Sequence, residues 1–213
     1  MPAKNISSEQ QLIKGLNNLG LQSEKAQIDK LLDYLQLLTK WNKTHNLTAI
    51  IDLDKMIDLH LLDSLSVLKH IKGPTLLDVG SGAGLPGLII AVFRPDIQVS
   101  SIDTRGKKIQ FQQFVASELD LDNFHSIHSR VEEYQVKKRY QQIISRAFSS
   151  LDNFLSWTKH LLEDDGQWLA MKGQIPHDEL KELLDKQDLS PTMIEPLQVP
   201  ISVGERHLLT FKR

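Results

Sequence analysis

Hydrophobic residues in the first third of the chain recur with the period of an α-helix. Leu12, Leu16 and Leu19 lie three or four positions apart. A denser stripe follows, made of Ile28, Leu31, Leu32, Leu35 and Leu38. This spacing is typical of amphipathic helices that bury one face, and Ser23 is the predicted N-cap of the second helix.

A third helical stretch runs roughly from Leu53 to His70 and meets a stop signal at Lys72-Gly73-Pro74. Glycine and proline directly after a periodic segment end a helix. Residues 1–73 are therefore predicted to form an N-terminal helical cap.

From Thr75 onward, segments of strand length alternate with helical segments. The predicted strands are Thr75–Val79, Gln98–Asp103, Asn123–His128, Gln141–Ser145 and Gln167–Lys172. The predicted helices are Pro86–Phe93, Lys107–Leu119, Leu151–Leu162 and His177–Lys186. Turns at Arg94-Pro95-Asp96 and Asp164-Asp165-Gly166 separate them. The alternation predicts an α/β domain over residues 74–213, with a mainly parallel, doubly wound sheet and helices on both faces.

The last part of the chain has a different pattern. Thr192–Val199 and Arg206–Lys212 both have the composition of strands and are separated by a loop. They predict a C-terminal antiparallel pair added to the sheet.

Composition narrows the class of protein. The chain has 213 residues, of which 40% are hydrophobic and 24% charged, as in ordinary globular proteins. We expect a cytoplasmic protein, because no apolar run reaches the length of about 18 residues that a spanning helix needs, and no signal core follows Met1. With no cysteine, disulfides, thiolate metal sites and cysteine nucleophiles are excluded. The net charge of −2 means that any RNA-binding surface must be local.

The most informative segment is the stretch from Asp78 to Gly87, in which glycines follow a predicted buried strand. Gly80, Gly82 and Gly84 alternate there, an arrangement that lets the backbone approach a nucleotide-like cofactor. Gly82-x-Gly84-x-x-Gly87 fits a dinucleotide fingerprint, with Asp103 about 20 residues on as the ribose ligand.

The carboxylate of Asp78, two positions before the first glycine, favours a different cofactor. S-adenosylmethionine carries a sulfonium and an ammonium group and no phosphate, so a carboxylate beside the loop suits it, whereas it would repel a pyrophosphate. Asp78-x-Gly80-x-Gly82-x-Gly84 resembles the loop of class I S-adenosylmethionine methyltransferases.

Several further strings stand in a fixed order along the chain. They are His60-Leu61-Leu62-Asp63-Ser64, Ser129-Arg130-Val131-Glu132-Glu133, Ser145-Arg146-Ala147-Phe148, Met171-Lys172-Gly173-Gln174 and Gly204-Glu205-Arg206-His207. Together with the glycine loop they resemble the bacterial ribosomal RNA small subunit methyltransferase G family, also called glucose-inhibited division protein B, from about Asn46 to the C-terminus. The resemblance implies a Rossmann-like class I methyltransferase that transfers a methyl group from S-adenosylmethionine to N7 of one guanine of 16S rRNA near the decoding centre.

The resemblance also implies the cofactor-binding residues. Gly80 and Leu85 would lie against the methionine part, with Asp78, Gly82 and Gly84 completing the loop. Asp103 would bind the ribose, or instead cap the following helix. Val131 and Glu132 would contact the adenine, or else be first-turn residues of a helix.

Arg146 is the one candidate catalytic residue. The family assigns its position to cofactor binding, and an arginine at the carboxyl end of a strand could also contact the target guanine or its phosphate. A surface salt bridge is the alternative. Phe148 could stack on a flipped base or lie in the core. His60 and Asp63 share a helix face, and either face the substrate cleft or form a local pair.

Guanine N7 has a free lone pair, so its methylation needs alignment of nitrogen, methyl and sulfur but no general base. Ser145-Arg146-Ala147-Phe148 stands where exocyclic-amine methyltransferases carry an Asn/Asp-Pro-Pro-aromatic motif. No metal site is expected, because His125 and His128 would point to opposite faces of a strand. The basic residues expected to touch RNA are Lys107, Lys108, Lys137, Lys138, Arg139, Lys172 and Arg206.

We expect a monomer that acts on 16S rRNA or the small ribosomal subunit. Three alternatives stay open: a methyltransferase acting on a small molecule or a protein, an NAD(P)-linked oxidoreductase, and an RNA chaperone that binds the cofactor without transferring its methyl group.

Overall fold

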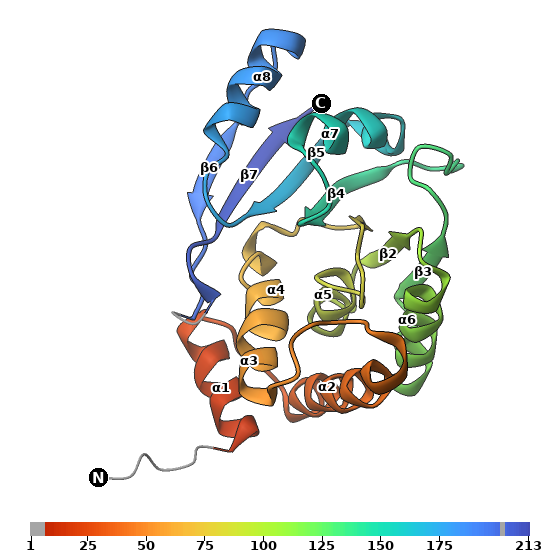
Figure 1. Ribbon diagram of the computed structural model, residues 1–213, viewed down its shortest axis with the longest axis vertical. Coiled ribbons are helices and arrows are strands. Elements are labelled where there is room, and N and C mark those ends of the chain that lie inside the picture. The colour runs from red at the N-terminus through yellow and green to blue at the C-terminus, as the bar shows by residue number, and fades with distance from the viewer. Residues whose placement is uncertain (1–6, 201–202) are drawn as a thin grey trace.

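The computed structural model describes residues 7–200 and 203–213, and its centre is one seven-stranded sheet (Figure 1). The strands are β1 (Thr75–Val79), β2 (Gln98–Asp103), β3 (Phe124–His128), β4 (Tyr140–Arg146), β5 (Leu162–Lys172), β6 (Met193–Pro196) and β7 (His207–Lys212). Their order across the sheet is β3-β2-β1-β4-β5-β7-β6. The first five are parallel, β7 is antiparallel to β5, and β6 is antiparallel to β7. This confirms the predicted fold class and the C-terminal antiparallel pair.

The largest error in the predicted strands is at the start of β5. The sequence places a turn at Asp164-Asp165-Gly166, but β5 already begins at Leu162. Leu162 pairs with Tyr140 of β4 and Gln167 with Gln142, so the expected turn residues form an irregularity within the strand. Extra residues opposite a regular partner strand are accommodated as a bulge, which polar residues and glycine tolerate.

Helices cover both faces of the sheet. One face carries α5 (Gly87–Phe93) and α6 (Gly106–Glu118), and the other carries α7 (Leu151–Thr158) and α8 (His177–Gln187). In Figure 1, α7 and α8 lie at the top, and the N-terminal helices lie at the bottom. The 3₁₀ turn η3 (Lys159–Leu161) extends α7, so the helix predicted to Leu162 ends earlier and less regularly. The remaining helix bounds differ from the prediction by at most one residue at either end.

The N-terminal helices pack on the α5 face of the sheet. They are α1 (Ser8–Asn18) and α2 (Lys25–His45), and both bury leucines in the same apolar cluster as α5. The prediction that Ser23 caps α2 is wrong, because the N-cap is Glu24, whose backbone N–H donates to Gln27 Oε1 at 2.9 Å. Glu24 and Gln27 each accept a hydrogen bond from the other's backbone N–H, as in a capping box, and this places the N-cap one residue after Ser23.

The third predicted helix is broken into four short pieces. They are α3 (Leu53–Met56), the π-helix η1 (Ile57–Leu62), α4 (Asp63–Leu65) and the 3₁₀ turn η2 (Leu68–His70). The apolar pattern correctly indicates helical backbone but cannot distinguish its α, π and 3₁₀ forms. The wider π turn is significant because such turns are frequent at functional sites.

Candidate functional site

The glycine loop leaves β1 with its backbone in conformations that side chains disfavour. Gly80, Gly82 and Gly84 have φ values of +70°, +60° and +87°. Within the loop, the N–H groups of Gly84 and Leu85 both donate to Ser81 O, at 2.9 and 2.8 Å. Glycine adopts this left-handed region at little cost, and its missing side chain leaves room for a ligand beside the backbone.

Three neighbouring elements hold this loop. From β2, Ile102 O accepts a hydrogen bond from Gly80 N–H at 2.9 Å. From α2, the buried hydroxyl of Tyr34 donates to Ala83 O at 3.0 Å. From α6, Gln112 Nε2 donates to Ser81 Oγ and Gly82 O, at 2.9 and 2.8 Å. The loop is thus fixed in shape before any ligand binds.

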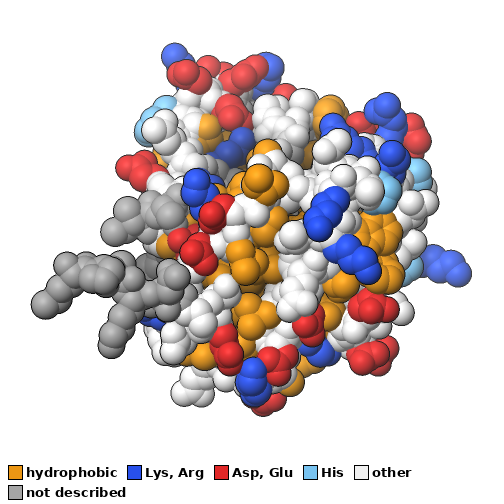
Figure 2. All heavy atoms as spheres, turned by 60° about the horizontal axis from the view of Figure 1, so that its bottom comes forward, with side chains coloured by type: hydrophobic (Ala, Val, Ile, Leu, Met, Phe, Trp, Pro, Cys, Tyr) orange, Lys and Arg blue, Asp and Glu red, His pale blue; other side chains and the backbone are white. Residues whose placement is uncertain are grey.

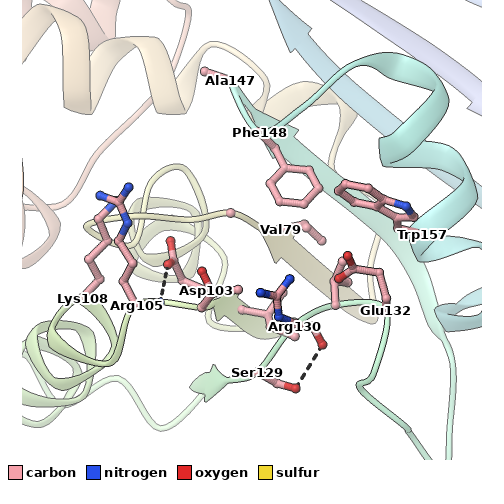
Figure 3. Close-up of a pocket in the computed structure, with 14 residues that line it drawn as sticks. Val79, Asp103, Arg105, Lys108, Ser129, Arg130, Glu132, Ala147, Phe148 and Trp157 are labelled. Atoms are coloured by element: carbon pink, nitrogen blue, oxygen red, sulfur yellow. Dashed lines mark hydrogen bonds between the residues drawn. The ribbon is translucent and has the colours of Figure 1, made fainter.

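A first cavity, of about 370 Å³, opens beside the loop at the carboxyl ends of the strands (Figure 3). Gly80, Asp103, Val131 and Glu132 all line it, so the fold brings together four of the predicted cofactor residues. The segment that joins β3 to β4 contains no helix, so the interpretation of Val131 and Glu132 as first-turn helix residues is wrong. Open α/β sheets bind ligands at this edge.

Asp103 links the first cavity to the loop. Its Oδ2 accepts from Gly82 N–H and its Oδ1 from Arg105 N–H, both at 2.9 Å. The second bond lies at the start of α6, so the capping role is present in part. A carboxylate fixed by two backbone donors keeps its remaining acceptor capacity for hydroxyl groups in the cavity.

Two aromatic side chains form one wall of the first cavity. Phe148 and Trp157 meet edge to face with ring centroids 6.0 Å apart, and Figure 3 shows both rings beside Val79 and Glu132. A Cβ added at Gly80 would lie 2.4 Å from Phe148 Cδ2. Phe148 therefore lies in the first cavity, against the glycine loop, and does not line the cavity that contains Arg146.

A second cavity, of about 330 Å³, lies on the other side of the same loop. Gly80, Gly82, Leu85 and Arg146 line it. Gly80 and Ala147 line both cavities, so the two share a wall. Ala147 has a φ of +52°, which is uncommon for a residue with a side chain, and such strain clusters at functional sites.

Arg146 is held at the second cavity by residues of the N-terminal cap. Its Nη1 donates to Asp63 Oδ2 at 2.7 Å and to Leu59 O at 2.9 Å. Leu59 belongs to the π-helix, and Asp63 follows it directly. Arg146 is therefore not part of a surface salt bridge, since the Asp63 side chain is only 1% exposed.

Asp63 and His60 both line the second cavity, but they do not bond to each other among the described residues. Asp63 Oδ1 accepts from Arg206 Nε at 2.9 Å, so this carboxylate has two arginine partners. His60 Nε2 is 3.1 Å from Thr48 Oγ1. Burial lowers the pKa of His60 to about 4, with a contribution from the charge of Arg146, so its ring is neutral at pH 7.

Asp78 and Gly84 are the two predicted cofactor residues that line neither cavity. Asp78 is fully buried, and its Oδ2 accepts from Gly87 N–H at 2.7 Å. Burial raises the pKa of Asp78 to about 7. The Asp78 carboxylate therefore bonds to the end of the loop but is exposed to neither cavity, because side chains alternate along β1 and this one points toward α5.

The predicted RNA-binding residues are dispersed. Lys108 lines the first cavity and Arg206 the second, whereas Lys172 pairs with Glu179. Arg139 pairs with Asp164 at the opposite edge of the sheet and lines neither cavity, so we do not include it in the RNA site. Lys107, Lys137 and Lys138 are exposed. On the face shown in Figure 2, basic and acidic side chains are interspersed without forming one continuous basic patch.

Some residues of the site were not predicted from the sequence. Trp157 lines the first cavity from α7, and Leu47 and Thr48 line the second from the segment between α2 and α3. Asn42 fixes that segment, accepting from Thr48 N–H and donating to Thr48 O, both at 2.9 Å. A tryptophan on a helix face gives no sequence signal that distinguishes a cavity wall from core.

Comparison with known proteins agrees with this geometry. The family model of rRNA small subunit methyltransferase G matches residues 27–209. The ribosomal RNA small subunit methyltransferase G of Methylobacillus flagellatus is 48% identical over 201 residues, covering 94% of this chain and 96% of its own. The protein of the same name from Ruthia magnifica is 46% identical, over 98% of this chain and 99% of its own.

The solved structures agree on the fold. A SAM-dependent methyltransferase from Aquifex aeolicus superposes with a TM-score of 0.55 at 18% identity, covering 74% of this chain and 92% of that one. In the part of the chain that the structure describes, no helix is both long and apolar enough to cross a membrane.

Proposed function

The chain belongs to the rRNA small subunit methyltransferase G family, and we propose that it transfers a methyl group from S-adenosylmethionine to N7 of one guanine of 16S rRNA, near the decoding centre. The observation that carries this proposal is the pair of cavities sharing Gly80 and Ala147. A donor whose adenosyl part occupies the first cavity and an acceptor base in the second would meet at that wall. Two reactants held in contact and in line are the main requirement of a direct transfer.

The first cavity fits the adenosyl part of the cofactor. Asp103 offers carboxylate oxygens to the ribose hydroxyls, and Val131 and Glu132 lie where the adenine would be. Phe148 fills the space beside Gly80, so a Cβ there would collide with this side chain and displace the aromatic wall of the first cavity. The methionine end would extend from Gly80, at the shared wall, into the second cavity along Gly82, Leu85 and Arg146, and the acceptor base would occupy the rest of that cavity.

Asp78 and Gly84 act indirectly in this proposal. Asp78 holds the start of α5 through Gly87 N–H, and a Cβ at Gly84 would lie 3.0 Å from Leu88 Cβ. Both support the loop from behind and do not touch the cofactor.

The reaction requires little acid–base chemistry from the protein. S-adenosylmethionine supplies an electrophilic methyl group, and guanine N7 brings its own lone pair. His60, buried and with a pKa of about 4, is a weak base and stays neutral. A neutral ring adds no further positive charge to the cavity in which the purine itself becomes cationic as it is methylated.

The proposal takes the chain to act as a cytoplasmic monomer. One chain lines both cavities, so a second copy is not needed to complete the site. With a net charge of −2, the protein is expected to recognise folded rRNA or a partly assembled subunit by shape.

The test is methyl transfer to small subunits from cells that lack the modification, followed by nucleoside analysis. We expect 7-methylguanosine to appear only when S-adenosylmethionine is present. Methylation at another atom would contradict the assignment to N7. Binding of subunits without any transfer would instead favour a chaperone.

A thermal-shift series addresses the cofactor. A ligand that binds the folded state raises its melting temperature by mass action. We expect S-adenosylhomocysteine to stabilise the protein and NAD to leave it unchanged, and the reverse result would support the oxidoreductase alternative.

A further inference from the structure

The buried carboxylate of Asp63 binds two arginines from distant parts of the chain. Arg146, at the end of β4, reaches Oδ2 at 2.7 Å, and Arg206, just before β7, reaches Oδ1 at 2.9 Å. Asp63 is 0% exposed, and the two arginine side chains are 20% and 25% exposed. All three residues line the second cavity.

This arrangement leaves the second cavity with an excess of positive charge. Two guanidinium groups share one carboxylate, His60 is neutral, and no other charged side chain of the described residues lines the cavity. A cavity lined by more cationic than anionic side chains favours an anionic ligand. Arginine is well suited to carboxylates and phosphates, because it can bind them with two parallel hydrogen bonds.

The two arginines differ in where they can meet such an anion. Arg146 is tied to both Asp63 and Leu59 O, and it lies next to Ala147, in the wall shared with the first cavity. Arg206 also lines an outer cavity of about 480 Å³, whose other lining residues are Pro196, Leu197, Val199, Pro200, Gly204, Glu205 and His207. Arg206 therefore lies between the second cavity and this outer cavity, where an anionic group that enters from the outer cavity would meet it.

The proposed reaction limits what Arg206 can bind. Arginine most often reads guanine through O6 and N7, but a hydrogen bond to N7 would occupy the lone pair that must accept the methyl group. An arginine beside this guanine is therefore better suited to the nucleotide's backbone than to that edge of its base.

We propose that Arg206 binds an RNA phosphate group flanking the target guanine, and that Asp63 is the residue that positions its guanidinium. This inference rests on the proposed function. Asp63 holds the Nε side of Arg206, and Glu205 O accepts from Nη1 at 3.0 Å, so the planar group is fixed from two directions.

The test compares Arg206→Gln and Arg206→Lys with the matched control Arg139→Gln. Arg139 pairs with Asp164 outside both cavities. Small subunits lacking the modification are the substrate, and the measured quantities are KM for subunits, kcat, the salt dependence of subunit binding, and S-adenosylhomocysteine affinity by calorimetry. Thermal unfolding of each variant shows that it is folded.

For Arg206→Gln we expect KM to rise about tenfold, because a charge-assisted hydrogen bond is lost. The slope of log affinity against log salt becomes shallower by about 0.7 to 0.9, the value for one phosphate contact. The change in kcat stays within about threefold, and cofactor affinity is unchanged. Arg206→Lys keeps the salt slope and recovers part of KM, and Arg139→Gln behaves as wild type.

Asp63→Asn separates positioning from binding. It keeps an acceptor oxygen but loses the charge, so KM should rise while the number of phosphate contacts, read from the salt slope, is retained. An unchanged KM and slope in Arg206→Gln would overturn the proposal, and so would a fall in S-adenosylhomocysteine affinity, which would assign Arg206 to the cofactor. Failure of the wild-type enzyme to methylate subunits would instead overturn the proposed function itself.

Discussion

The two ends of β4 carry the same pair of residue types in two different settings. Arg139 stands just before the strand and pairs with Asp164 at 3.0 Å, with side chains 44% and 83% exposed. Arg146 ends the strand and pairs with Asp63 at 2.7 Å, with side chains 20% and 1% exposed. Exposed pairs contribute about 0–1 kcal/mol and are easily replaced. A buried pair fixes geometry, and its loss leaves a charge without its partner.

The contrast extends along both edges of the sheet. At the amino edge, Arg94 and Asp96 form another pair in the turn before β2, with Asp96 60% exposed. At the carboxyl edge, Gly80, Gly82 and Ala147 have positive φ values, and each carboxylate oxygen of Asp103 accepts a hydrogen bond from a backbone N–H. Positive φ values and fixed polar groups thus occur together where the strands end, which is expected of a binding edge.

The largest difference between the two ends should appear on removing each arginine. Arg146→Ala is expected to lower kcat/KM for methyl transfer about ten- to hundredfold, because one charge-assisted hydrogen bond is worth about 1.5–3 kcal/mol. Arg146→Lys recovers part of the rate, since a point charge cannot reproduce the planar fork. Arg139→Ala should stay within about twofold of wild type. Equal losses of kcat/KM in Arg146→Ala and Arg139→Ala would contradict the distinction between the buried and the exposed pair.

The buried carboxylate of Asp78 should make stability depend on pH. Its pKa of about 7 in the folded protein exceeds its unfolded value. The folded state therefore retains a proton that the unfolded chain releases, and the free energy of unfolding falls as pH rises from about 4 to about 7. Asp78→Asn cannot lose a proton, so its free energy of unfolding should not fall in this pH range, and its side chain keeps an oxygen for Gly87 N–H. At pH 8 we expect its free energy of unfolding to exceed that of wild type by about 2 kcal/mol.

Urea unfolding at pH 5 and pH 8 measures this difference. Asp164→Asn is the control at the amino edge, because its carboxylate is 83% exposed and should leave the curves unchanged. Parallel pH profiles for Asp78→Asn and wild type would show that burial does not control the protonation of Asp78.

Gly80→Ala should weaken cofactor binding more than its backbone strain explains. The added Cβ would lie 2.4 Å from Phe148 Cδ2, so the aromatic wall must move. We expect S-adenosylhomocysteine affinity to fall about tenfold, consistent with the cost of overpacking. Gly20 has the same φ of +70° with nothing within 4 Å, so Gly20→Ala adds similar strain without the collision. Calorimetry that finds both variants equally impaired, or both unaffected, would argue against the first cavity as the cofactor site.

The smallest expected effect concerns the hydroxyl of Tyr34. Tyr34→Phe removes the donor to Ala83 O, and we expect cofactor affinity to fall about three- to tenfold, the worth of one neutral hydrogen bond. Tyr140, at the amino end of β4, is also buried. Tyr140→Phe should lower the melting temperature without changing cofactor affinity. Identical affinities in the two variants would mean that the N-terminal cap does not shape the loop.

The elements were predictable where local pattern decides them. β1 and β2 match the prediction to the residue, because turn residues directly precede both: Lys72-Gly73-Pro74 stands before β1 and Arg94-Pro95-Asp96 before β2. The π-helix at Ile57–Leu62 was not predictable, since apolar spacing there fits an α-helix equally well. The bulge in β5 was missed because Asp164-Asp165-Gly166 has the composition of a turn, and only pairing with β4 reveals its place.

Most of the predicted site residues line one of the two cavities, but their contacts were not predictable. Gly80, Asp103 and Arg146 were found because strand ends and glycine spacing mark them. The partners of Asp63 lie 83 and 143 residues away, and no local pattern carries that information. The direction of the Asp78 side chain depends on how β1 packs against α5.

Those separations also determine when the site can form during folding. Closing loops of 83 and 143 residues costs chain entropy that only an assembled sheet can offset, so the Asp63 contacts should form after the transition state. We therefore expect Asp63→Asn to accelerate unfolding and leave the refolding rate nearly unchanged, a φ-value near zero. The two arginines would then reach their positions only late on the folding pathway, when the sheet between them is already complete.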